Sequence, residues 1–140
     1  MIKELCDLFI DSIDVLKEKL ANRHPKDYDD LLKMTIECMN LKREKTYDDE
    51  NILDPSSIHA IYKGSYSGTL IYIIHDSCAM PHNYWYTWVD YGSCSACDTF
   101  ESIKNYEADE IELPTQSQID DYVTLALHMI QRTRKLEVGL

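Results

Sequence analysis

Long hydrophobic runs are missing from this sequence. The longest apolar run, residues 69–74, has the length of a strand, whereas about 18 uninterrupted apolar residues are needed to cross a bilayer. Residues 1–20 mix charges into their apolar residues at every turn, and so lack the hydrophobic region of a signal peptide. We therefore expect no membrane-spanning segment and an N-terminus that belongs to the mature fold.

Basic residues are scarce. Against 25 Asp and Glu there are 14 Lys and Arg, so the formal net charge is −11. A phosphate backbone would be repelled rather than neutralised, and direct binding of nucleic acid is not expected. An acidic surface instead suits a basic partner. The 140 residues, 44% of them hydrophobic, fit a single globular domain over 1–140.

Familiar catalytic motifs are absent too. The sequence has no Gly-rich phosphate loop, HExxH, GxSxG or EF-hand pattern, which leaves the standard nucleotide-binding and hydrolase classes without support. The five cysteines are odd in number, which favours a reducing cytoplasm over a secreted disulfide framework. They are Cys6, Cys38, Cys78, Cys94 and Cys97.

The periodicity of apolar residues changes along the chain. Helical spacing predicts helices over about 2–20, 27–45, 95–106 and 117–136, the last opened by a capping box of Ser117 and Asp120. Runs of β-branched and aromatic residues predict strands over about 58–62, 68–75 and 84–91. This order predicts an α+β fold, in which a small antiparallel sheet of about three strands packs with two N-terminal and two C-terminal helices on one face.

One short motif, Tyr91 to Asp98, has the composition of a chemical site. Cys94 and Cys97 are separated by two residues where a predicted strand runs into a helix N-terminus. Free N–H groups and the helix dipole stabilise a thiolate there, so Cys94 and Cys97 are candidate catalytic residues for thiol–disulfide chemistry. Against this, the thioredoxin type needs a parallel βαβ unit, and Asp98 places a negative charge beside Cys97.

Zinc is the second interpretation of the pair. His75, Cys78 and His82 precede it, but a strand of about 30 Å would separate the two clusters. Zinc at Cys94 and Cys97 would then need further ligands, and the remaining candidates are Cys6, Cys38, His24, His59 and His128. We therefore expect no cofactor, with zinc as the alternative.

A purely structural interpretation accounts for the same motif. Gly92 would supply a backbone conformation, Ser93 or Ser95 would cap the helix, and the two cysteines would fill small buried gaps. Asp98 also fits this interpretation, as a carboxylate in the first turn that faces the helix dipole.

The motif and the strands before it resemble a known group of proteins. Residues 84–103, YWYTWVDYGSCSACDTFESI, preceded by 62–74, YKGSYSGTLIYII, are similar to small uncharacterised proteins of tailed phages and large DNA viruses. Their shared signature is a strand, then Tyr-Gly-Ser-Cys-Ser-x-Cys-Asp, a Thr and a helix. The resemblance covers roughly 58–103, and Ala96 stands where Gly is more usual. It implies a viral origin and no particular mechanism.

Other polar and aromatic groups have two interpretations each. His75, Asp76 and His82 could serve as acid–base groups, but side chains at a turn are usually solvated. The aromatic residues of 84–91 could form a platform on which bases or a peptide stack. However, bulky residues occupy both the odd and the even positions of this strand, which favours a strand covered on two faces. The acidic stretch 107–112 is expected to be solvated, with a DNA-mimicking surface as its alternative.

These observations predict a small acidic accessory protein of viral type, located in the host cytoplasm. It would bind a host or viral protein, one with a basic surface being the natural match, and have no catalysis of its own. Thiol-redox or zinc chemistry at Cys94 and Cys97 is the first alternative, and a DNA-mimic inhibitor the second. A homodimer stays open, because tyrosine-rich strands favour an interface without requiring one.

Overall fold

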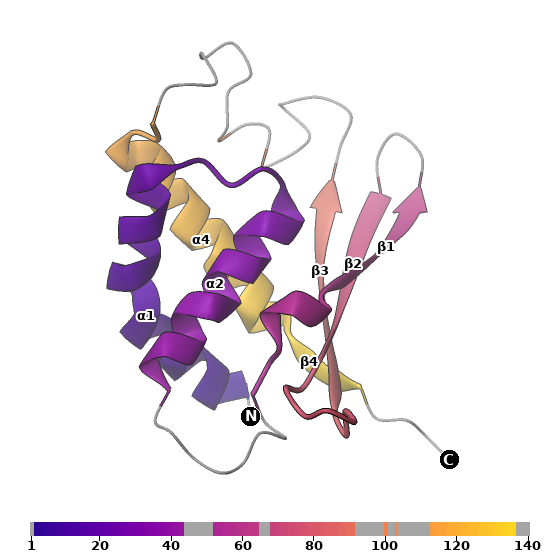
Figure 1. Ribbon diagram of the computed structural model, residues 1–140. Coiled ribbons are helices and arrows are strands. Elements are labelled where there is room, and N and C mark those ends of the chain that lie inside the picture. Colours follow the sequence, from indigo (N-terminus) through magenta and orange to yellow (C-terminus); the bar gives the residue numbers. More distant parts are fainter. Residues whose placement is uncertain are drawn as a thin grey trace.

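The protein folds as a layer of helices against a sheet, in a computed structural model that describes residues 2–43, 52–64, 68–91, 100, 103 and 113–136 (Figure 1). The helices lie on one side of the sheet and are α1 (Ile2–Asn22), α2 (Tyr28–Lys42) and α4 (Gln116–Arg132). The four antiparallel strands follow the order β1 (His59–Gly64), β2 (Gly68–His75), β3 (Tyr84–Tyr91) and β4 (Arg134–Leu136). The predicted α+β class, the antiparallel sheet and the helices on one face are confirmed.

The sheet has one strand more than predicted. Helix α4 ends at Arg132, whereas the sequence predicted a helix to residue 136, and residues 134–136 instead form β4 beside β3. The chain passes from α4 into β4 at Thr133. The backbone of Thr133 is extended, and its hydroxyl donates to the Met129 carbonyl at 3.0 Å. The error has a simple cause, because Arg134 and Lys135 suit an exposed edge strand as well as a helix C-terminus.

The remaining boundaries differ by a few residues. Helix α1 is two residues longer than predicted, and β1 begins one residue later and ends two later, whereas β2 and β3 match. Asp27 is the N-cap of α2, accepting from the Asp30 N–H at 2.8 Å. The capping box of α4 is formed by Thr115 and Gln118, not by Ser117 and Asp120. Of the predicted helix 95–106, only Phe100 and Ile103 are described, and both are helical.

The inner face of the sheet closes the hydrophobic core. Alternate residues of β2 and β3 point toward the helices and are buried: Leu70, Tyr72, Ile74, Trp85, Thr87 and Val89. Helix α4 lies against β3, and α1 packs against both α2 and α4. The Thr87 hydroxyl joins the layers by donating to the Met129 carbonyl at 2.6 Å. None of the described helices is long and apolar enough to span a membrane.

Candidate functional site on the outer sheet face

The opposite face of the sheet, here called the outer face, turns away from the helices (Figure 1). The strand register arranges its residues in cross-strand rows, because directly paired residues project from the same side. One row joins Ile61, Ile71 and Trp88; the next joins His59, Ile73, Tyr86 and Arg134. The register positions of Lys63, Thr69 and Asp90 form the row at one end, and His75, Tyr84 and Leu136 form the row at the other.

Large apolar side chains on this face remain open to solvent. Ile61, Tyr84 and Leu136 are 37%, 38% and 37% exposed, and Ile71, Ile73, Tyr86 and Trp88 are half-buried. Because these residues are cross-strand neighbours, they form a contiguous patch rather than scattered exposed side chains. Contiguous apolar patches on a protein surface are typical of interaction sites.

The sequence predicted that the aromatic strand is covered on two faces, and in the described part of the chain this is wrong. Trp85 is 1% exposed beneath the helices, whereas Tyr84, on the outer face, is 38% exposed. The strand carries bulky residues on both of its faces. However, the three described helices all lie on one side of the sheet, so no described helix covers the other side (Figure 1).

Two aromatic rings lie side by side along β3. The Tyr86 and Trp88 rings are nearly parallel, with 6.0 Å between their centroids and 25° between their planes. The guanidinium carbon of Arg132 lies 5.9 Å from the centroid of Trp88, and its Nη1 donates to the Trp88 carbonyl at 3.3 Å. This bond satisfies a backbone carbonyl of β3 beyond the end of its pairing with β4.

A hollow of about 310 Å³ lies on the outer face. It is lined by Thr69, Ile71, Tyr86, Trp88 and Asp90. Asp90 is the single charged residue of this lining, and its carboxylate accepts from the Thr69 hydroxyl at 3.2 Å. Sequence reasoning missed Thr69, Ile71, Asp90 and Arg132 as site residues. One signal was available, since Asp90 is the only charged residue in the strand 84–91.

The turn between β2 and β3 holds a buried carboxylate. Asp76 is fully buried, and accepts from the N–H groups of Cys78, His82 and Asn83 at 3.1, 3.0 and 2.8 Å. Burial raises the pKa of Asp76, but the hydrogen bonds from Asn83, His82 and Cys78 outweigh it and hold the pKa below its ordinary value. The predicted solvated turn is therefore wrong for Asp76, which is a structural anchor.

In the described contacts, the two histidines of the same turn have different partners and do not converge on one site. His75 Nδ1 lies 2.6 Å from the Asp76 carbonyl, and the ring of His75 is edge-on to Tyr84. His82 is exposed and contributes its backbone N–H to Asp76. The described contacts thus assign His75 and His82 a structural role in the turn.

The cysteine motif lies outside the described residues. Gly92, Ser93, Cys94, Ser95, Cys97 and Asp98 belong to this part, and Tyr91 is described only as the last backbone position of β3. After the motif, Phe100 is buried, and its N–H donates to the Tyr28 hydroxyl at 3.1 Å. The redox and zinc interpretations of the motif stay predictions.

Two of the described cysteines, Cys6 and Cys38, have a raised thiol pKa. Burial raises the pKa of Cys6, and the neighbouring Asp7 raises it further. Burial also raises the pKa of Cys38. Among the described residues, no three His, Cys, Asp or Glu side chains gather as a metal site would require. A role for Cys6 and Cys38 in thiol chemistry is disfavoured by the raised pKa values.

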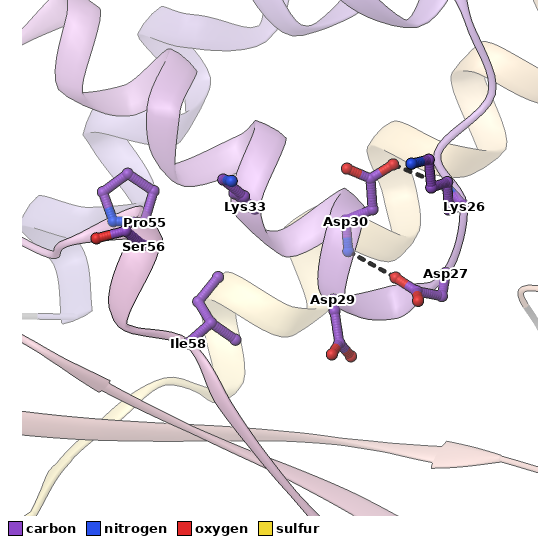
Figure 2. Close-up of a pocket in the computed structure, with 8 residues that line it drawn as sticks. All are labelled: Lys26, Asp27, Asp29, Asp30, Lys33, Pro55, Ser56 and Ile58. Carbon is purple, nitrogen blue, oxygen red and sulfur yellow. Dashed lines mark hydrogen bonds between the residues drawn. The ribbon is translucent and has the colours of Figure 1, made fainter.

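A second hollow, of about 360 Å³, lies between the N-terminus of α2 and the short 3-10 helix η2 (Pro55–Ser57) (Figure 2). Two of the three acidic residues that line it, Asp27 and Asp30, make hydrogen bonds within the fold. Asp27 caps α2, and Asp30 accepts from the Lys26 N–H at 2.8 Å and from two Arg23 nitrogens at 2.6 and 3.1 Å. Burial raises the pKa of Asp30, but Arg23 and Lys26 lower it below its ordinary value. These carboxylates stabilise a helix start.

The acidic stretch 107–112 also lies outside the described residues, so the DNA-mimic interpretation stays a prediction. Together, the fold and the outer face define an α+β protein whose sheet is covered by helices on one side. No family model, curated protein or solved structure matches the chain. The resemblance to viral proteins likewise stays a prediction.

Proposed function

We propose that this protein works by binding another protein through the outer face of its sheet, without catalysis of its own. The observation that supports the proposal is the contiguous row of Ile61, Ile71 and Trp88, which is apolar and belongs to the face of the sheet that turns away from the described helices (Figure 1). Burying such a patch against a partner removes apolar surface from water, which is the main driving force of protein association. The viral origin and the intracellular location stay predictions from the sequence.

Variants that place a charge on the outer face test this proposal. Ile71→Asp and Ile61→Asp alter the face at its centre and at the edge strand. Ile10→Asp is the matched control, because Ile10 is 59% exposed on α1 in the helical layer. Each variant is immobilised, incubated with lysate and compared with the wild type by quantitative mass spectrometry.

A partner should be retained by the wild type and by Ile10→Asp, and reduced about tenfold or more by the two outer-face variants, as expected for a charge placed in an apolar contact. Thermal unfolding of each variant shows that the fold persists. Retention of the same partners by all four proteins, or recovery of none above background, would contradict the proposal.

A further inference from the structure

The hollow on the outer face has the residues needed to hold a cationic side chain. Ile71 and Trp88 are direct cross-strand partners, as are Thr69 and Asp90, so four of its five lining residues belong to two adjacent rows. Tyr86 completes the lining beside Trp88. The hollow is therefore built by strand pairing, on regular backbone, rather than by a loop.

The aromatic part of the lining suits a cation. Tyr86 and Trp88 lie nearly parallel along the strand and are half-buried. The faces of such rings carry partial negative charge and attract guanidinium and ammonium groups. The molecule already shows this contact, because the guanidinium of Arg132 lies over the Trp88 ring. Arg132 itself does not line the hollow.

The charged part of the lining has the complementary sign. Asp90 is exposed, and no described cationic side chain forms an ion pair with it. Its hydrogen bond with the Thr69 hydroxyl occupies one carboxylate oxygen, Oδ1. A carboxylate accepts several hydrogen bonds, so Asp90 retains capacity for an arginine or lysine head group.

The charge of the whole molecule favours the same kind of partner. A net charge of −11 attracts a basic protein over distances longer than any single contact and raises the rate of encounter. Long-range attraction of this kind does not determine which face of the protein the partner binds. The outer-face hollow determines the face, because its apolar and aromatic floor holds the stem of a long side chain while Asp90 holds the charged end.

We propose that the outer-face hollow receives an arginine or lysine side chain of a basic partner protein, which lies on Tyr86 and Trp88 and pairs with Asp90. The inference rests on the proposed function, because it names the chemistry of the partner for the same face. It makes the hollow an anchor point within the docking surface, of the kind in which a few side chains supply most of the binding energy.

The test uses a synthetic Gly-Ser peptide that contains four arginines, and a matched peptide with four citrullines in their place. NMR titration follows the two indole N–H signals separately, one from Trp88 in the hollow and one from the buried Trp85. The arginine peptide should shift the Trp88 signal and leave that of Trp85 in place. The neutral citrulline peptide should produce no comparable shift.

Two variants with the same change in net charge separate the hollow from general attraction. Asp90→Asn should weaken binding about fivefold, the upper range for an exposed ion pair. Asp121→Asn, at an exposed position of α4 outside the hollow, should weaken it by less than about twofold, since exposed charges far apart are screened. Thermal unfolding checks that both variants remain folded.

Each other outcome overturns the proposal. Equal weakening by Asp90→Asn and Asp121→Asn, or equal shifts by both peptides, would show that charge alone attracts the peptide. Tighter binding of a ten-nucleotide oligouridine would favour an anionic ligand for the face. A concentration-dependent dimer in analytical ultracentrifugation, broken by Ile61→Asp, would favour a second copy. In these cases the lysate comparison of Ile71→Asp with Ile10→Asp still decides separately whether the face binds a protein.

Discussion

The two faces of the sheet are built from alternating residues of the same strands, yet they have opposite environments. On β3, Trp85 is buried against the helices, whereas Trp88, three positions further on, is half-buried and lines a hollow. On β2, Tyr72 is fully buried and its neighbour Ile71 faces outward. A strand with bulky residues at both parities therefore does not establish that both faces are covered. The difference arises from the placement of the three helices.

The largest expected effect comes from removing one tryptophan from each face. Trp85→Ala should lower the free energy of unfolding by about 4 kcal/mol, because it leaves a cavity in the core. Trp88→Ala should lower it by about 1 kcal/mol, since solvent already reaches this side chain. Chemical denaturation followed by circular dichroism measures both changes. Equal destabilisation by the two substitutions would break the comparison, because it would mean that the outer face is as well covered as the inner one.

The buried carboxylate of Asp76 helps to keep the inner and outer faces of the sheet distinct, because it fixes the turn that sets the register of β2 and β3. A slip of one residue would exchange the two faces. Asp76→Asn should lower the free energy of unfolding by about 2 to 3 kcal/mol, since the amide cannot accept all three N–H bonds as the carboxylate does. Asp90→Asn, on the exposed outer face, is the control and should change stability by less than about 0.5 kcal/mol.

The Asp76 variant should also change the dependence of stability on pH. The folded-state pKa of Asp76 lies below its ordinary value, so this stabilisation is complete above about pH 4, the usual pKa of an unfolded Asp, and is lost as the pH falls through the lower folded pKa. Unfolding curves from pH 2 to 7 should therefore show a smaller loss of stability at acid pH for Asp76→Asn. The same acid dependence in both proteins would remove Asp76 as its cause.

Much of the fold was accessible from the sequence, because helix and strand periods are local signals. The strands 68–75 and 84–91 match the structure at both ends, and their Gly and polar flanks explain why. Strand β4 was missed because three residues show no period, and because it forms only through pairing with Tyr84, Trp85 and Tyr86, which are about fifty residues away in the sequence.

The candidate site was less accessible, for a physical reason. The motif of Cys94 and Cys97 is contiguous in the sequence and attracts notice, whereas the hollow joins Thr69 and Ile71 of one strand to Trp88 and Asp90 of another. Their proximity depends on the pairing register, and their exposure depends on which face the helices occupy. Neither property is encoded in the local pattern of a single strand.

The smallest expected effect comes from two threonines, one on each face of the sheet. Thr87, on the inner face, is buried and donates to the Met129 carbonyl of α4, whereas Thr69, on the outer face, donates to the Asp90 carboxylate. Thr87→Val should lower the free energy of unfolding by about 1 kcal/mol, because a buried carbonyl loses a donor while Thr133 still reaches it. Thr69→Val should change it by less than about 0.5 kcal/mol, since water replaces the lost hydroxyl. Denaturant titrations of the two variants measure this difference directly. A larger loss for Thr69→Val would show that the outer-face hydrogen bond lies in a dry environment, which is incompatible with an open face.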